Sequence, residues 1–193
     1  MATEETDFEF RGINHLALVC KDMARTVEFY RDKLGMKLTK TINMPGGMGQ
    51  HFFFDIGNGD SLAFFWFPDA PDAAPGVASP ASLPTRGDIR TAHGSMNHVA
   101  IGVPAEKFDA YYQRLQEKGV EVSMILNHDD SDMQISMEVT DEVFVRSFYF
   151  FDPDGACLEF ATWHRPLTPE RDVVHDPMRA DGTVAKNMVT GRT

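Results

Sequence analysis

The stretch FYFFDPDGACLEFATW, residues 148–163, combines two runs of strand-forming residues, a turn and one carboxylate. Residues 148–151 are aromatic, residues 152–155 have turn chemistry, and residues 157–163 are typical of a returning strand, so the stretch predicts a β-hairpin. Glu159 lies in the middle of the second strand. Because an unpaired buried carboxylate is very costly, we expect Glu159 to be protonated, paired with a cation or bound to a metal.

Composition excludes several classes of protein around this hairpin. A chain of 193 residues with 42% hydrophobic residues is enough for one globular domain or two packed halves. A formal charge of −11 argues against nucleic acid and anionic membranes as partners. The longest strongly apolar run, residues 62–67, is too short to cross a bilayer, and the acidic start MATEETD does not fit a signal or transit peptide. Two cysteines fit a reducing compartment, so we expect a cytoplasmic protein.

The chain contains a duplicated unit. INHLALVC, residues 13–20, is a strand-like run, and Asp22 then stands at the N-cap position of a helical pattern that ends in glycine. MNHVAIGV, residues 96–103, is followed by a second helical pattern over residues 104–118. A hairpin closes each half. The equivalent pairs are His15 and His98, Gly35 and Gly119, and Leu62 and Leu158, at offsets of 83, 84 and 96. The growing offset predicts an insertion within residues 120–147.

These repeats set the predicted boundaries. We expect an N-terminal arm over residues 1–11, a first module over residues 12–67, a Pro-rich connection over residues 68–94, a second module over residues 95–164 and a C-terminal arm over residues 165–193. A connection of this length without structure of its own is expected to cover a pocket or a neighbouring subunit.

Each half carries an Asn-His pair in its first strand. His15 and His98 occupy equivalent positions of the duplication, and a pseudo-twofold arrangement brings them to equivalent places. Glu159 is the acidic group available to join them. Two imidazoles and one carboxylate form a facial triad that leaves roughly three open positions on an octahedral metal.

Three motifs carry a family resemblance: NHLAL with FYRDKLGM, NHVAI with YYQRLQEKG, and FYFFDPDGACLEF. Over about residues 12–163 the chain resembles the vicinal oxygen chelate superfamily, which includes glyoxalase I, bleomycin-resistance proteins and type I extradiol dioxygenases. The resemblance implies an α+β fold in which two tandem βαβββ modules form a curled mixed sheet around a metal cleft. It also implies that the metal ligands are His15, His98 and Glu159.

The family's general pattern has one metal ligand on the first strand and one on the last strand of each module, four in all. One departure from this pattern separates the subfamilies. Ala63 aligns with Glu159 and cannot coordinate a metal. Glyoxalase-like lyases generally have an acidic or amide ligand in both last strands, whereas extradiol dioxygenases use two histidines and one glutamate. Tyr149, ten residues before Glu159, also resembles the extradiol signature, but that signature's upstream histidine is missing from residues 139–147. The other candidates for proton transfer are His51, His93, His128 and Tyr149, among which His51 and Tyr149 are the predicted catalytic residues.

Three functions follow from these observations. The first is a non-haem Fe(II) ring-cleaving dioxygenase that acts on a catecholic or related small molecule with O2 and works as a homodimer, with Mn, Zn, Ni or Co as alternative metals. The second is a glyoxalase-type lyase, isomerase or epimerase that acts through a metal-stabilised enediolate. The third is a non-catalytic drug-binding protein. The predicted aromatic lining of the site is Phe53, Phe64, Trp66, Phe148, Phe150 and Trp163.

Overall fold

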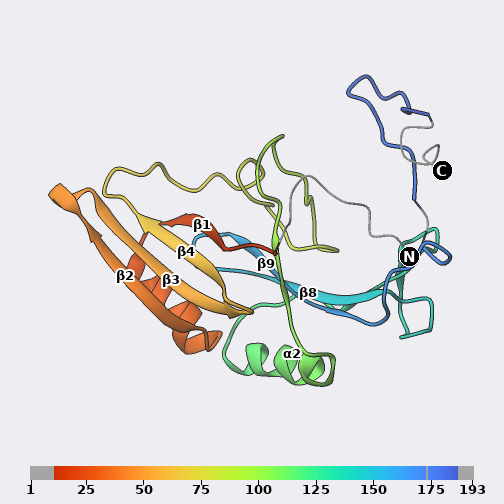
Figure 1. The fold of residues 1–193 in the computed structure, drawn as a ribbon, viewed down its shortest axis with the longest axis horizontal. Coiled ribbons are helices and arrows are strands. Elements are labelled where there is room, and N and C mark those ends of the chain that lie inside the picture. The colour runs from red at the N-terminus through yellow and green to blue at the C-terminus, as the bar shows by residue number, and fades with distance from the viewer. Residues whose placement is uncertain (1–10, 173, 187–193) are drawn as a thin grey trace. The chain divides into compact units, whose positions relative to one another are not determined.

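The computed structural model describes residues 11–172 and 174–186, so the predicted N-terminal arm falls almost wholly outside the described residues (Figure 1). The chain divides into two compact units, Met1–Met124 with Phe148–Phe160, and Ile125–Ser147 with Ala161–Thr193. Within the described ranges, no helix is long and apolar enough to span a bilayer.

The first module is one mixed sheet with a helix on one face. Its strand order is β1-β4-β3-β2, in which β1 and β4 are parallel and the other neighbours are antiparallel (Figure 1). Its elements are β1 (His15–Cys20), α1 (Met23–Val27), η1 (Glu28–Lys33), β2 (Lys37–Met44), η2 (Pro45–Gly47), β3 (Gly49–Gly57) and β4 (Asp60–Trp66). Strand β2, which the sequence did not distinguish from its neighbours, completes the βαβββ order.

The predicted cap and stop signals of the first helix are confirmed. The Asp22 carboxylate accepts hydrogen bonds from the N–H groups of Ala24 and Arg25, as an N-cap does. After Val27 the helix continues with the wider turns of a π-helix, and Gly35 ends it in the left-handed conformation at φ +79°. Tyr30, which is fully buried, projects from this segment onto the sheet.

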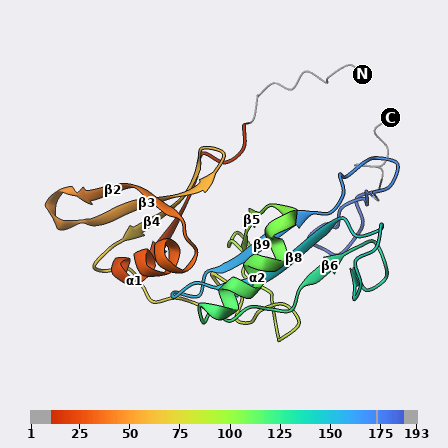
Figure 2. The same ribbon diagram turned by 90° about the horizontal axis from the view of Figure 1, so that it is seen from below.

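The second module repeats the order of elements and adds one short strand. Its sheet has the strand order β5-β9-β8-β6-β7, and Figure 2 shows α2 lying along β8 and β9. The Phe148 ring lies 5.3 Å from the Phe108 ring and 5.0 Å from the Tyr112 ring, so α2 covers an aromatic core. The elements are β5 (Val99–Gly102), η3 (Ala105–Lys107), α2 (Phe108–Glu117), β6 (Leu126–His128), β7 (Ile135–Ser136), β8 (Val145–Phe151) and β9 (Cys157–Trp163).

The architecture confirms the predicted α+β fold with two tandem modules. The curling of the sheets around one cleft stays a prediction. The predicted insertion holds β6, β7 and the connection between them, in which Asp129 is buried. The Pro-rich connection is tied to the second module where the Arg86 side chain donates to the Val122 carbonyl at 3.0 Å.

A buried hydrogen bond joins the two modules within the first unit. The Tyr30 hydroxyl donates to the Asp152 carboxylate at 3.0 Å, and both side chains are buried. The other Asp152 oxygen accepts the N–H groups of Asp154 and Ala156, which closes the predicted hairpin turn. Desolvation raises the pKa of Asp152, and desolvation together with the Asp152 charge raises the pKa of Tyr30 well above its ordinary value.

This burial predicts a pH dependence of stability. Because the pKa of Asp152 is raised, the folded chain holds this proton more tightly than the unfolded chain. The stability that protonated Asp152 contributes to the folded chain is therefore fully present below the ordinary aspartate pKa of about 4. It is lost as the pH rises through the raised pKa.

Asp152→Asn should flatten that dependence, because its amide retains the acceptor oxygen and can donate to Tyr30. Urea unfolding at several pH values above and below the ordinary pKa measures the effect, with the exposed Asp69→Asn as control. If the free energy of unfolding of Asp152→Asn changes with pH as steeply as that of the wild type, the expectation is contradicted.

Candidate functional site

The structure brings together two of the three predicted ligands. Glu159 projects from β9 and is 6% exposed, and His98 immediately precedes β5. Nε2 of His98 lies 3.1 Å from Oε2 of Glu159. The carboxylate that sequence analysis placed in an apolar strand therefore has an imidazole partner.

The tautomer of His98 follows from a chain of hydrogen bonds. The Asn97 amide nitrogen donates to the Ile89 carbonyl at 2.7 Å, which orients the amide, since a carbonyl can only accept. Oδ1 of Asn97 then faces Nδ1 of His98 at 2.9 Å, so Nδ1 carries the proton. In the neutral ring, Nε2 presents its lone pair to the Glu159 carboxylate.

Two lone pairs that face each other need a positive charge between them. A shared proton is one solution, and a divalent cation is the other. Neighbouring ligands on an octahedral metal with bonds of about 2.1 Å lie about 3 Å apart. The observed separation of 3.1 Å matches that value, and a neutral imidazole with a carboxylate is a suitable donor set for Zn, Mn or Fe. The residues present therefore fit a metal.

His15 has the same local chemistry in the first module. Its Nδ1 lies 2.8 Å from Oδ1 of Asn14, and its ring packs edge-on against Phe53 at 5.7 Å between centroids. The side chain is exposed. Among the described residues of a single chain, no three His, Cys, Asp or Glu side chains gather closely enough to hold a metal. One chain by itself therefore does not bring His15 to His98 and Glu159.

The sheet face that carries His15 is the one opposite the helix. Phe53 pairs with Ala63 across β3 and β4, and Ala63 is fully buried, so the position equivalent to Glu159 offers no ligand. His51 lies on the same face by strand alternation and is half-buried. Its ring stacks on Phe65 at 3.6 Å between centroids and an angle of 6°.

Tyr149 lies beside the His98 and Glu159 pair. It is 8% exposed, and its ring packs edge-on against the His98 ring at 5.4 Å between centroids. Its backbone N–H donates to the Ser123 hydroxyl, which fixes the strand at this point. Cys157 is buried, and desolvation with the nearby Glu159 charge raises its pKa to about 11, so it is a neutral thiol at pH 7.

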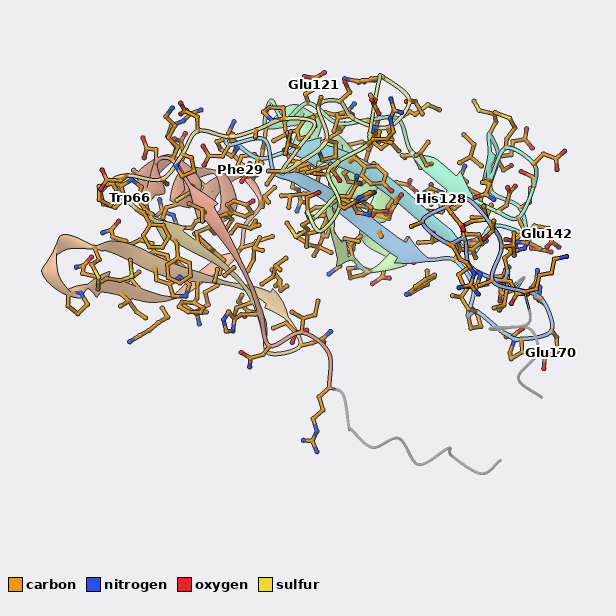
Figure 3. The ribbon with its side chains drawn as sticks, turned by 90° about the horizontal axis from the view of Figure 1, so that it is seen from above. Phe29, Trp66, Glu121, His128, Glu142 and Glu170 are labelled. Atoms are coloured by element: carbon orange, nitrogen blue, oxygen red, sulfur yellow. The ribbon has the colours of Figure 1, made fainter. Side chains whose placement is uncertain are left out.

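The predicted aromatic lining was partly wrong. Phe64, Phe148 and Phe150 are at most 1% exposed and pack in the two cores, because their strand faces are covered by helices. The ring of Phe29, which is labelled in Figure 3, lies 6.5 Å from the Phe150 ring, measured between centroids. Phe53 lies on the face that carries His15. Phe65 and Phe67, whose rings stack at 5.3 Å between centroids, continue that face and were not among the predicted lining residues.

The remaining predicted histidines lie elsewhere. His93 is exposed in the Pro-rich connection. His128, labelled in Figure 3, projects from β6 in the second unit, where its Nε2 lies 3.1 Å from the Ser147 hydroxyl. The residue that sequence reasoning missed is Ile89, whose carbonyl orients Asn97. The repeated Asn-His pair was its visible signal, but a backbone carbonyl eight residues away leaves no trace in composition.

Comparison with known proteins shows the family of the chain. The Glyoxalase/Bleomycin resistance protein/Dioxygenase superfamily model matches residues 12–160. The chain is 28% identical over 152 residues to a protein named metallothiol transferase FosB from Lysinibacillus sphaericus, covering 79% of this chain and 82% of that protein.

Two solved structures are similar in fold. A glyoxalase family protein from Enterococcus faecalis has a TM-score of 0.54 at 22% identity, covering 79% of this chain and 98% of that one. FosX from Listeria monocytogenes, described as a fosfomycin resistance protein complexed with Mn(II) and sulfate, has a TM-score of 0.50 at 18% identity, covering 84% and 98%. With two βαβββ modules, a paired His98 and Glu159 and a family match over most of its length, the chain belongs to the glyoxalase/bleomycin resistance protein/dioxygenase superfamily.

Proposed function

We propose that the protein is a metal-dependent enzyme that binds a small molecule through two adjacent oxygen atoms. The observation that carries this proposal is the 3.1 Å approach of His98 Nε2 to Glu159 Oε2, with the tautomer held by Asn97. A buried carboxylate beside an imidazole nitrogen at this distance is a donor pair that a divalent cation can bind.

The third ligand is His15 of a second copy of the chain. His15 is exposed on a sheet face whose apolar residues are left open to solvent: Val19 is 53% exposed, Ile42 38% and Phe67 37%. An open apolar face of this kind is typical of an interface. A twofold homodimer that covers it makes two equal sites, each with His15 from one copy and His98 and Glu159 from the other.

The protein's own groups do most of the positioning. Glu159 projects from β9 and His98 immediately precedes β5, and the Tyr149 ring packs edge-on against the His98 ring. When bound, the divalent cation supplies Lewis acidity to the substrate oxygens. The chain supplies the aromatic rings of Phe53 and Phe65 on the sheet face that carries His15.

Two reaction classes fit this site. Two histidines and one glutamate are the donor set of non-haem Fe(II) oxygenases, which supports a ring-cleaving dioxygenase acting on a catecholic molecule with O2. The similarity to a metallothiol transferase supports a group transfer or addition to a substrate held by Mn or another divalent metal. A lyase, isomerase or epimerase is less well supported, since Ala63 removes the second acidic ligand. A non-catalytic drug-binding protein is also less well supported, because it does not need the His98 and Glu159 pair to bind its ligand.

Substitution of Asn97 tests whether it holds the tautomer of His98. Asn97→Ala frees the His98 ring to rotate and to change tautomer, and loss of such an outer partner typically weakens metal binding by about 10- to 100-fold. Calorimetric titration with Zn(II) or Mn(II) measures the change. The matched control is Asn43→Ala, an asparagine on β2 that hydrogen-bonds Gln50, and it should bind metal like the wild type. Equal affinity in all three proteins contradicts the assignment.

Mixed dimers test the shared site. His15→Ala and Glu159→Ala chains, each with a different affinity tag, are expressed together and the mixed dimer is isolated. One of its two sites then retains His15 from one chain and Glu159 from the other, so we expect half the wild-type metal content and almost none in either mutant homodimer. If each site were built from one chain, the mixed dimer would also bind almost no metal.

Metal content and oxygen uptake separate the two reaction classes. Protein purified without added metal and without oxygen is assayed for bound metals, then supplied with catechols and O2, or with a thiol and fosfomycin. Iron at about one per chain with catechol-dependent O2 uptake supports the dioxygenase. Loss of thiol without O2 uptake supports group transfer. Absence of any bound metal, before and after loading, contradicts the proposed function.

A further inference from the structure

We propose that His51 is a catalytic residue that accepts a proton from the substrate's hydroxyl group. This inference rests on the proposed function, because it places His51 in the site that His15 enters. It assigns a base to a chain whose second module lacks the histidine expected upstream of Tyr149.

His51 lies on the same sheet face as His15. In β3, alternation places His51 and Phe53 on one side and Phe54 on the other, where Phe54 contacts Tyr30 beneath the helix. The Phe53 ring bridges the two histidines, at 4.2 Å from the His51 ring and 5.7 Å from the His15 ring. A substrate bound at His15 therefore lies along a wall that ends in His51.

The tautomer of His51 leaves a basic nitrogen on that wall. Nδ1 lies 3.2 Å from the Phe64 carbonyl, and because a carbonyl only accepts, Nδ1 donates. The neutral ring therefore carries its lone pair on Nε2. Stacking on Phe65 and contact with Phe53 fix the plane of the His51 ring. The direction of Nε2 is therefore set before substrate binds.

The surroundings of His51 are mainly apolar. Its partners across the sheet are Phe65 on β4 and Ile42 on β2, neither of which titrates. On the same face, by register, the titratable groups are His15 on β1, Lys37 and Lys40 on β2, and Asp55 on β3. Another candidate for proton transfer, His128, has its Nε2 3.1 Å from the Ser147 hydroxyl.

The proposed step is a proton transfer. The O–H bond of the substrate hydroxyl breaks, a bond forms between that hydrogen and His51 Nε2, and the oxygen keeps the electron pair. The imidazolium that results is stabilised by the Phe64 carbonyl at Nδ1 and by the face of the Phe65 ring. Proton transfer to a positioned base typically contributes about 10²- to 10⁴-fold to rate.

The test uses 4-nitrocatechol, whose absorbance reports each of its ionisations. Zn-loaded wild type, His51→Asn, His51→Gln and the exposed control His93→Asn are each titrated with the probe across pH. We expect the bound probe to lose its second proton at a pH about one unit higher in both His51 variants than in the wild type and the control. Circular dichroism and Zn(II) affinity, which should be unchanged in the variants, confirm that the fold and the metal site remain.

Chemical rescue distinguishes a base from a packing residue. Imidazole added to His51→Ala should return the ionisation of the probe toward the wild-type pH, whereas added benzene, which fills space without a basic nitrogen, should not. If the bound probe loses its second proton at the wild-type pH in the Zn-loaded His51 variants, this inference is overturned and the proposed function still stands. A wild-type protein that binds no Zn(II) overturns both.

Discussion

The buried carboxylate of Glu159 is the constraint on which the site depends. An ionised group in an apolar strand must be neutralised, and His98 lies at the required distance with its proton held on the far nitrogen by Asn97. The hairpin that carries Glu159 is itself fixed by another buried carboxylate, Asp152, which closes the turn and accepts the Tyr30 hydroxyl from the first module. Two buried acids thus organise the second module, one for structure and one for chemistry.

The two modules share an origin in sequence but no longer carry the same groups. Each retains an Asn-His pair, yet the carboxylate position of the second module is Ala63 in the first, covered by Phe53. The first module has instead a row of rings that includes His51 and Phe65. The proposed site is consistent with this difference, because one carboxylate with two imidazoles would neutralise part of a divalent charge and leave positions open for substrate.

Much of the fold could be predicted from sequence. The hairpin at Glu159, the Asp22 cap and the glycine at the end of the first helix were all visible, because they depend on local chemistry and short periodicity. Strand β2 was not distinguished, since KLTKTINM is half exposed and has weak hydrophobic contrast. The conversion of the helix to π-type turns over Glu28–Lys33 and the burial of Asp129 depend on tertiary packing, which sequence periodicity does not record.

The approach of His98 to Glu159 could be anticipated for the same reason, since His98 belongs to a repeated motif and Glu159 breaks an apolar run. The proposed sharing of ligands between copies of the chain could not, because symmetry in sequence does not reveal which modules meet. The account's central claim is that two histidines and Glu159 hold one metal ion, and X-ray absorption of the Zn-loaded wild-type protein tests it most directly. The account predicts scattering from two imidazole rings with Zn–N distances of about 2.0–2.1 Å. A spectrum that fits a single imidazole would contradict it.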